Sequence, residues 1–150
     1  MRALLRAVIY GMPFAYMGFI WYLSSCPSDA VINTGLPFDA LLKETLHLVE
    51  FAFLYLLWVL FFMARGNLSR KLNLLAAALA VLYGFVDEAH QYFVPSRSAT
   101  VIDLIKNTAG VAAAWYFVDK ALFHDRSSGL GRVLVRIGAM SPPNQRHSLY

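Results

Sequence analysis

A stretch near the middle of the chain, VDEAHQYFVPSRS at residues 86–98, carries ionisable side chains at short intervals. Asp87 and Glu88 are adjacent carboxyls, and such a pair can act as general acid and base. Arg97 presents a planar fork of N–H groups that suits phosphate or carboxylate. Gln91 adds an amide that both donates and accepts hydrogen bonds. The stretch therefore contains the side chains of a binding or catalytic site.

Further polar residues flank this stretch, at 44, 47 and 50 before it and at 103, 106 and 107 after it. We predict that His47, Asp87 and Glu88 form an acid–base group. The predicted ligand-binding residues are Glu50, Gln91, Arg97, Asp103, Lys106 and Asn107. The histidine and the carboxyls are also ligand types for a hard or borderline metal ion, but their spacing matches no metal motif. No metal and no particular cofactor is therefore predicted.

The remainder of the chain is too apolar for a soluble domain. Of its 150 residues, 59% are hydrophobic and 15% are charged, whereas soluble domains average about half apolar and about a quarter charged. The net charge is +4, but the basic residues form no stripe with interleaved aromatics, so nucleic acid is not a predicted partner. The composition predicts a membrane protein.

Four apolar segments are long enough to cross a bilayer, at residues 4–23, 45–63, 72–94 and 101–123. A bilayer core of about 30 Å requires about 20 helical residues. Segments in lipid are helical because the backbone has no water to bond. We predict an all-α, polytopic protein whose transmembrane domain, residues 1–123, has four helices.

Basic residues predict the orientation of these helices. They precede the first segment, fill the connection between the second and third, and follow the fourth. The opposite connections carry only Lys43 and Arg97 against Asp29 and Asp39. The positive-inside rule therefore predicts that both termini are cytoplasmic. Residues 124–150 are predicted to be a basic, mostly flexible cytoplasmic tail with a short amphipathic stretch at 133–137.

With this orientation, the polar residues gather at the outer ends of the last three helices. At 100° per residue, Tyr83, Asp87 and Gln91 form one stripe with Glu88 at its flank, and Asp103 and the polar residues after it share another face. We expect these faces to meet. Charges in a bilayer are costly and mark functional sites by default. The alternative is a purely structural network of interfacial charges and ion pairs.

A different interpretation applies to the end of the first segment. Leu23-Ser24-Ser25-Cys26 is close to a lipoprotein cleavage box, which would make the first segment a signal peptide. Against this, the segment is long for a signal core and is interrupted by Gly11 and Pro13. Cys26 is the single cysteine, so no intrachain disulfide can form.

The central pattern resembles the signature of the VanZ-like family of small bacterial membrane proteins. It consists of Asp87-Glu88-x-x-Gln91-x-Phe93-Val94-Pro95-x-Arg97, followed by Asp103, Asn107 and Gly110. His47 with Glu50 and Phe51 resembles the family's H-x-x-E-Y element, and Ser24-Ser25-x-Pro27 resembles the serine pair that ends its first helix. The similarity covers about residues 8–118. One departure is Lys43-Glu44, where the family often has a basic residue just before the histidine.

The resemblance implies a protein of the bacterial cytoplasmic membrane with a role in the cell envelope. In the member that gives the family its name, that role is reduced sensitivity to a lipoglycopeptide antibiotic of the teicoplanin type. Our hypothesis is that the outer site binds the headgroup of a membrane lipid or a lipid-linked cell-wall precursor. The alternatives are a hydrolase or transferase acting on an envelope lipid, an ion-coupled transporter, and a structural network.

Overall fold

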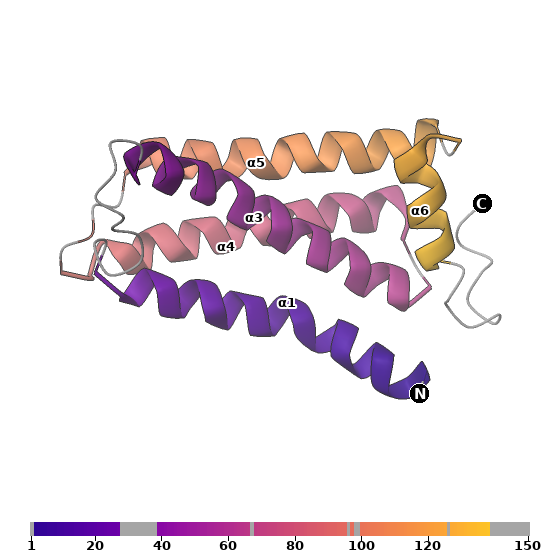
Figure 1. The fold of residues 1–150 in the computed structure, drawn as a ribbon, viewed down its shortest axis with the longest axis horizontal. Helices are drawn as coiled ribbons and strands as arrows, with labels where there is room; N and C mark the ends of the chain where they lie inside the picture. The colour runs from indigo at the N-terminus through magenta and orange to yellow at the C-terminus, as the bar shows by residue number, and fades with distance from the viewer. Residues whose placement is uncertain are drawn as a thin grey trace.

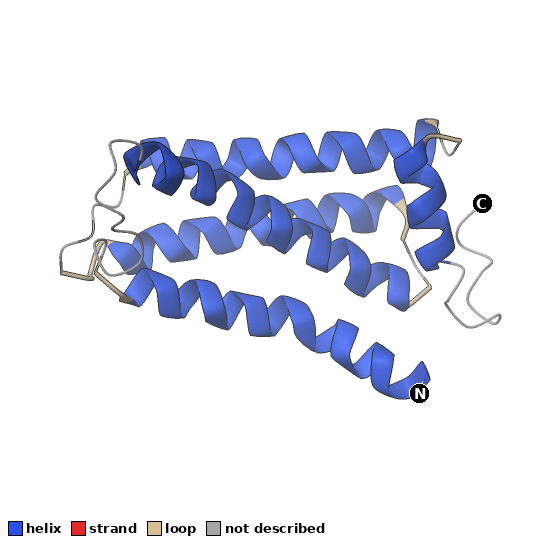
Figure 2. Ribbon diagram, in the orientation of Figure 1, coloured by secondary structure: helices blue, strands red, loops and turns tan. Residues whose placement is uncertain are grey.

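The computed structural model describes residues 2–27, 39–66, 68–95, 97, 100–125 and 127–138, and in these residues it contains helices and no strands (Figure 2). The prediction of an all-α fold is thus confirmed for the described part. The elements are α1 (Arg2–Ser25), α3 (Asp39–Ala64), α4 (Arg70–Gln91), α5 (Val101–Asp119), the π-helix η1 (Lys120–His124) and α6 (Gly129–Gly138).

The four long helices run alternately up and down, and α6 crosses one end of the bundle (Figure 1). Helix α3 is central and packs against α1, α4, α5 and α6, whereas α1 packs against α3 and α4. One end contains the last turns of α1 and α4 and the first turns of α3 and α5, and we call it the polar end. The opposite end, with the start of α4 and with α6, is the basic end.

Local sequence signals set the helix boundaries. Helix α4 begins after Ser69, whose hydroxyl accepts a hydrogen bond from the Leu72 N–H at 3.3 Å. Helix α5 begins after Thr100, which accepts from the Asp103 N–H at 3.1 Å. Both are N-caps that satisfy a backbone donor of the first turn. Gly66 has a φ of 78° in the connection between α3 and α4, a conformation that favours glycine.

The core lies between α3 and its neighbours. Its fully buried members include large residues of α3 and small residues of α4 and α5, namely Phe51, Leu54, Tyr55, Ala76, Ala80 and Val111. Gly110 of α5 lies directly against the backbone of Leu48 in α3: a Cβ added there would overlap the Leu48 carbonyl oxygen. Small residues therefore allow α4 and α5 to approach α3 closely.

The outer surface of the bundle is rich in large apolar side chains. Exposed examples occur on every long helix and include Phe19, Phe53, Leu82, Ile105 and Phe117. Among the described residues, Leu4–Ser25 and Arg70–Gln91 are long and apolar enough to cross a membrane, and Leu48–Ala64 is a shorter apolar helix. Only 11% of the first of these windows is buried within the protein. These features are consistent with a membrane protein; the count of four membrane-spanning helices and the location of the termini remain predictions.

The observed elements differ from the predicted segments in three main places. Helix α3 begins at Asp39 rather than at residue 45. Helix α4 ends at Gln91 rather than at residue 94, and a turn follows in which the Val94 N–H donates to the Gln91 carbonyl at 3.1 Å. In the tail that we predicted to be mostly flexible, residues 129–138 form α6, packed against η1 and α3. Helix α6 includes the amphipathic stretch predicted at 133–137 and extends it toward the N-terminus. Its Leu134 side chain is buried against the bundle. Residues 139–150 lie outside the described part.

Candidate functional site

A buried hydrogen-bond network joins α1 to α4 at the polar end. The Ser24 hydroxyl donates to Oδ1 of Asp87, and the Gln91 amide donates to Oδ2 of Asp87 at 2.7 Å. The same amide lies 3.5 Å from the Ser24 hydroxyl. All three side chains are buried. One turn of α4 therefore places Asp87 and Gln91 on the face that meets the last turn of α1.

Arg97 binds the end of α1 from the turn between α4 and α5. Its Nε donates to the Cys26 carbonyl at 2.8 Å and its Nη2 donates to the Leu23 carbonyl at 2.5 Å. These carbonyls belong to the C-terminal end of a helix, where a cation is favoured and where backbone acceptors lack helical partners. Arg97 therefore holds α1 in place, a role that we did not predict for it.

A second contact between α1 and α4 lies nearer the surface. Ser25 Oγ is 3.0 Å from Nε2 of His90, and the Ser25 hydroxyl also donates to the Trp21 carbonyl at 2.8 Å. The His90 ring stacks on the Trp21 ring with the centroids 3.8 Å apart. Both serines that end α1 thus contact α4.

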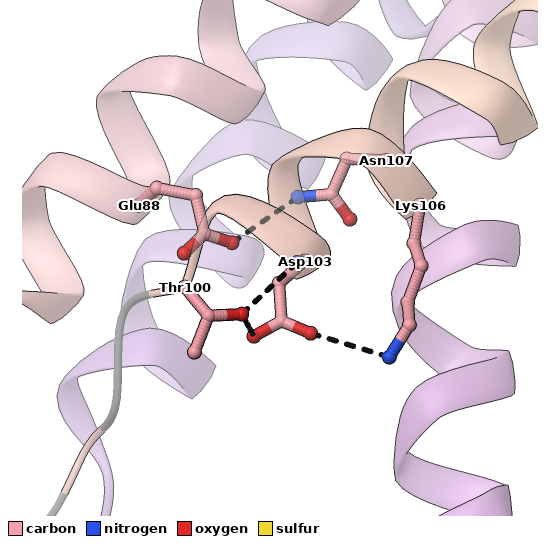
Figure 3. Close-up of polar contacts among 5 residues, drawn as sticks. All are labelled: Glu88, Thr100, Asp103, Lys106 and Asn107. Atoms are coloured by element: carbon pink, nitrogen blue, oxygen red, sulfur yellow. Dashed lines mark hydrogen bonds and ion pairs between the residues drawn. The ribbon is translucent and has the colours of Figure 1, made fainter.

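Glu88 and Asn107 form the contact between α4 and α5. The Asn107 amide nitrogen donates to Oε1 of Glu88 at 3.3 Å, and both side chains are buried. Figure 3 shows the amide nitrogen facing Glu88 and the amide oxygen turned away from it. Within the described part of the chain, Oε2 of Glu88 and Oδ1 of Asn107 make no hydrogen bond of normal geometry, although the Thr100 backbone N–H lies close enough to Glu88 to stabilise its carboxylate. Buried acceptors are usually satisfied, so these two call for an explanation.

Asp103 and Lys106 belong to the first turns of α5. The Thr100 hydroxyl donates to Oδ2 of Asp103 at 2.6 Å, and Lys106 Nζ lies 3.5 Å from the other carboxylate oxygen (Figure 3). Both charged side chains are half-buried. This arrangement is a capping group at a helix N-terminus, where a carboxylate also complements the helix dipole. Asp103 thus has a structural role at the start of α5.

Glu50 is half-buried on α3 and interacts electrostatically with Asp87 and Arg97. Glu88 is repelled electrostatically by both Asp103 and Asp87. The polar end therefore concentrates carboxyl groups, a setting suited to ligands that donate hydrogen bonds or carry positive charge. The His47 side chain lies outside the described residues. No group of three or more His, Cys, Asp or Glu residues in the described part could hold a metal ion.

The comparisons identify a family for the chain. A family model described as VanZ/LLP1 matches residues 8–123. The chain belongs to the VanZ/LLP1 family. No curated protein and no solved structure matches it. The VanZ/LLP1 match includes every residue of the polar end described above and ends before α6.

Of the predicted site residues of this VanZ/LLP1 protein, the structure brings Asp87 together with Gln91, Glu88 with Asn107, and Asp103 with Lys106. Sequence reasoning missed Ser24, Thr100 and the carbonyls that bind Arg97 as members of the cluster. The serine pair that ends α1 was the available signal for Ser24. Backbone carbonyls have no such signal, because every residue has one.

Proposed function

We propose that this VanZ/LLP1 protein crosses the bacterial cytoplasmic membrane four times, with both termini inside. Its polar end then faces outward and binds the headgroup of an envelope lipid or a lipid-linked cell-wall precursor. Binding of that ligand by the protein alters susceptibility to teicoplanin-type glycopeptides, which act on the cell wall. The apolar flanks of the bundle and the family membership support the membrane setting.

The observation that carries this proposal is the pair of buried acceptors on Glu88 and Asn107 without partners in the described residues. A buried acceptor without a partner is unfavourable, so a group with hydroxyl, amide or ammonium hydrogens gains by reaching it. Arg97 uses two of its N–H groups on α1 carbonyls, and an arginine has five. Its remaining donors suit a phosphate or carboxylate of the same headgroup.

The test is the binding of defined lipids to the purified protein and to its Glu88→Gln variant. Glutamine keeps the oxygen that accepts from Asn107 but replaces the unpartnered acceptor with a donor. The probes are phosphatidylethanolamine, phosphatidylglycerol and a lipid-linked disaccharide–pentapeptide precursor, measured by native mass spectrometry. A hydrogen bond to a charged group contributes about 1.5–3 kcal/mol, so we expect the bound probe to lose roughly tenfold or more in affinity.

Asp125→Asn is the matched control, because it makes the same carboxylate-to-amide change at an exposed position of the basic end. Its affinity for phosphatidylethanolamine, a zwitterionic lipid for which the basic end has no charge preference, should equal that of the unmodified protein. If no probe binds better to the unmodified protein than to a folded Glu88→Gln variant, the lipid-binding proposal fails.

A hydrolase or transferase acting on an envelope lipid is the second candidate. The observation that favours it is that Oε2 of Glu88 is buried and lacks a described partner, because a carboxyl in such a setting suits general acid–base catalysis. His47 and Asp87 would then complete the acid–base group. Turnover of the lipid-linked precursor by the unmodified protein, with a loss of at least about a hundredfold in Glu88→Gln, would favour the enzyme. Bound but unchanged precursor would exclude it for that substrate.

A further inference from the structure

Helix α6 lies outside the family match and is not part of the polar end. The residues that precede α6 determine the direction of its axis. The α5 backbone widens into the π-helix η1, where the Asp125 N–H donates to the Lys120 carbonyl at 2.8 Å. Ser128 then caps α6 by accepting from the Gly131 N–H at 3.1 Å. The result is a helix that crosses the end of the bundle instead of continuing along it (Figure 1).

The described side chains of α6 divide into three environments. Leu134 is 6% exposed and Gly131 is buried, on the side that packs against η1 and α3. Val133 is 53% exposed, and Arg132 is exposed as well. Consecutive residues of a helix are 100° apart, so Arg132 and Val133 lie on different sides of the buried side. One flank of α6 therefore offers an apolar side chain and another a cation.

Other basic residues surround α6 at the same end of the bundle. The exposed ones are Arg65, Arg70, Lys71 and Lys120. Their positive charge complements the phosphates of anionic phospholipids. A helix with a basic and an apolar flank that lies across the end of a membrane bundle has the geometry of an interfacial helix.

We propose that α6 lies in the membrane–water interface at the basic end and binds anionic phospholipid headgroups, with Val133 in the acyl boundary and Arg132 at the phosphates. This surface is separate from the polar end, so it stands or falls independently of the proposed lipid site there. A bilayer is favoured over a protein partner because the flanks of the bundle that adjoin this end are apolar.

The test uses a fluorescent reporter on the full chain in lipid nanodiscs. Cys26 is the single cysteine, so Cys26→Ser allows an NBD label to be attached at Val133→Cys or Gly129→Cys. Both positions are exposed, and a Cβ at Gly129 meets nothing within 4 Å. In phosphatidylglycerol discs, the label at 133 should emit at shorter wavelength and be quenched several-fold more by lipid-borne nitroxides than the label at 129. Equal, water-like emission and equal quenching at both positions would overturn the proposal.

The second arm separates the lipid from other ligands. Native mass spectrometry should show several-fold more retained phosphatidylglycerol than phosphatidylcholine, and Arg132→Gln should reduce that ratio while Arg132→Lys preserves it. Millimolar inorganic phosphate should leave the ratio unchanged. Displacement by phosphate would indicate a free-anion site. A label at 133 that is shielded from water but not quenched by lipid nitroxides would indicate a second copy or another protein on this face. Either result contradicts the proposal.

Discussion

Gly110→Ala is the substitution for which the structure makes the sharpest prediction. Gly110 is buried on α5 and faces the α3 backbone at Leu48. An added Cβ would overlap the Leu48 carbonyl oxygen and lie 3.0 Å from the carbonyl carbon and 3.3 Å from Cα. A backbone carbonyl inside a helix cannot rotate aside as a flexible side chain can. The two helices must therefore separate.

Two effects of opposite sign determine the magnitude. Alanine stabilises a helix interior over glycine by about 0.5–1 kcal/mol. Overpacking costs about 1–3 kcal/mol, and a clash with backbone belongs at the upper end of that range. The net expectation is a destabilisation of about 2 kcal/mol. For a chain of this length, about 1 kcal/mol corresponds to a shift of roughly 2–4 °C in the unfolding midpoint, so the midpoint should fall by about 4–8 °C.

Gly84→Ala is the matched control. It makes the same change in α4, but the added Cβ would lie 3.6 Å from Phe51 and 3.7 Å from the Asn107 Cβ, which are ordinary contact distances. We expect this variant to be unchanged or more stable by up to about 1 kcal/mol. Thermal unfolding of all three proteins in the same detergent, followed by circular dichroism, gives the comparison.

The result that would refute the reasoning is a Gly110→Ala protein as stable as Gly84→Ala. It would mean that α3 and α5 do not meet at Leu48 and Gly110, and the close approach of these helices would be wrong. A loss of stability in both variants would point to a general effect of alanine in detergent and would equally contradict the expected difference.

Three further predictions follow from single contacts. Arg97→Lys should destabilise the protein by about 1–3 kcal/mol, because an ammonium cannot reproduce two hydrogen bonds from one guanidinium fork. Amide hydrogen exchange in the last turn of α1 should increase in this variant, and unchanged exchange there would contradict the role of Arg97. Ser24→Ala should cost about 1–3 kcal/mol by removing a donor to the buried Asp87, and Ser24→Thr should restore most of it; equal midpoints for the two variants would refute this. The Ser127 hydroxyl donates to Asp125 and holds the pKa of that carboxyl below its ordinary value of 3.8. The contact therefore stabilises the folded state above pH 3.8 and ceases to do so as the pH falls through the lower pKa of folded Asp125. Amide hydrogen exchange in α6 should rise in that acidic range and not at neutral pH.

The helical segments were predictable from the length and composition of the apolar runs. Long apolar runs predicted the helices within a few residues, with the largest differences at polar helix ends. Helix α3 begins at Asp39 rather than at residue 45, because Lys43 and Glu44 are helix formers as well as charges. Helix α4 stops before Pro95, which disfavours a helical residue ahead of it.

The faces of the predicted site followed from the 100° helical period, and Asp87, Gln91 and Asn107 are indeed buried together with Gly84 and Gly110. The helical period cannot predict which neighbouring helix each polar face contacts. Helix α1 carries few polar side chains, and its part in the cluster depends on Ser24 and on two backbone carbonyls. Arg97 was therefore predicted to face a ligand, whereas its observed hydrogen bonds are to carbonyls at the end of α1.

The polar end is stable in an apolar bundle because most of its charged groups have neighbours of complementary chemistry. Arg97 has helix-terminal carbonyls, and Asp103 has a capping hydroxyl and a lysine. Each such pairing reduces the free-energy cost of burying the charged group. Without a partner, a polar group in an apolar environment costs several kcal/mol. The Glu88–Asn107 contact is satisfied on one side and, among the described residues, open on the other. If the cluster were only a packing network, its buried acceptors would gain by having partners, so the open side of this contact is the feature on which the proposed ligand depends.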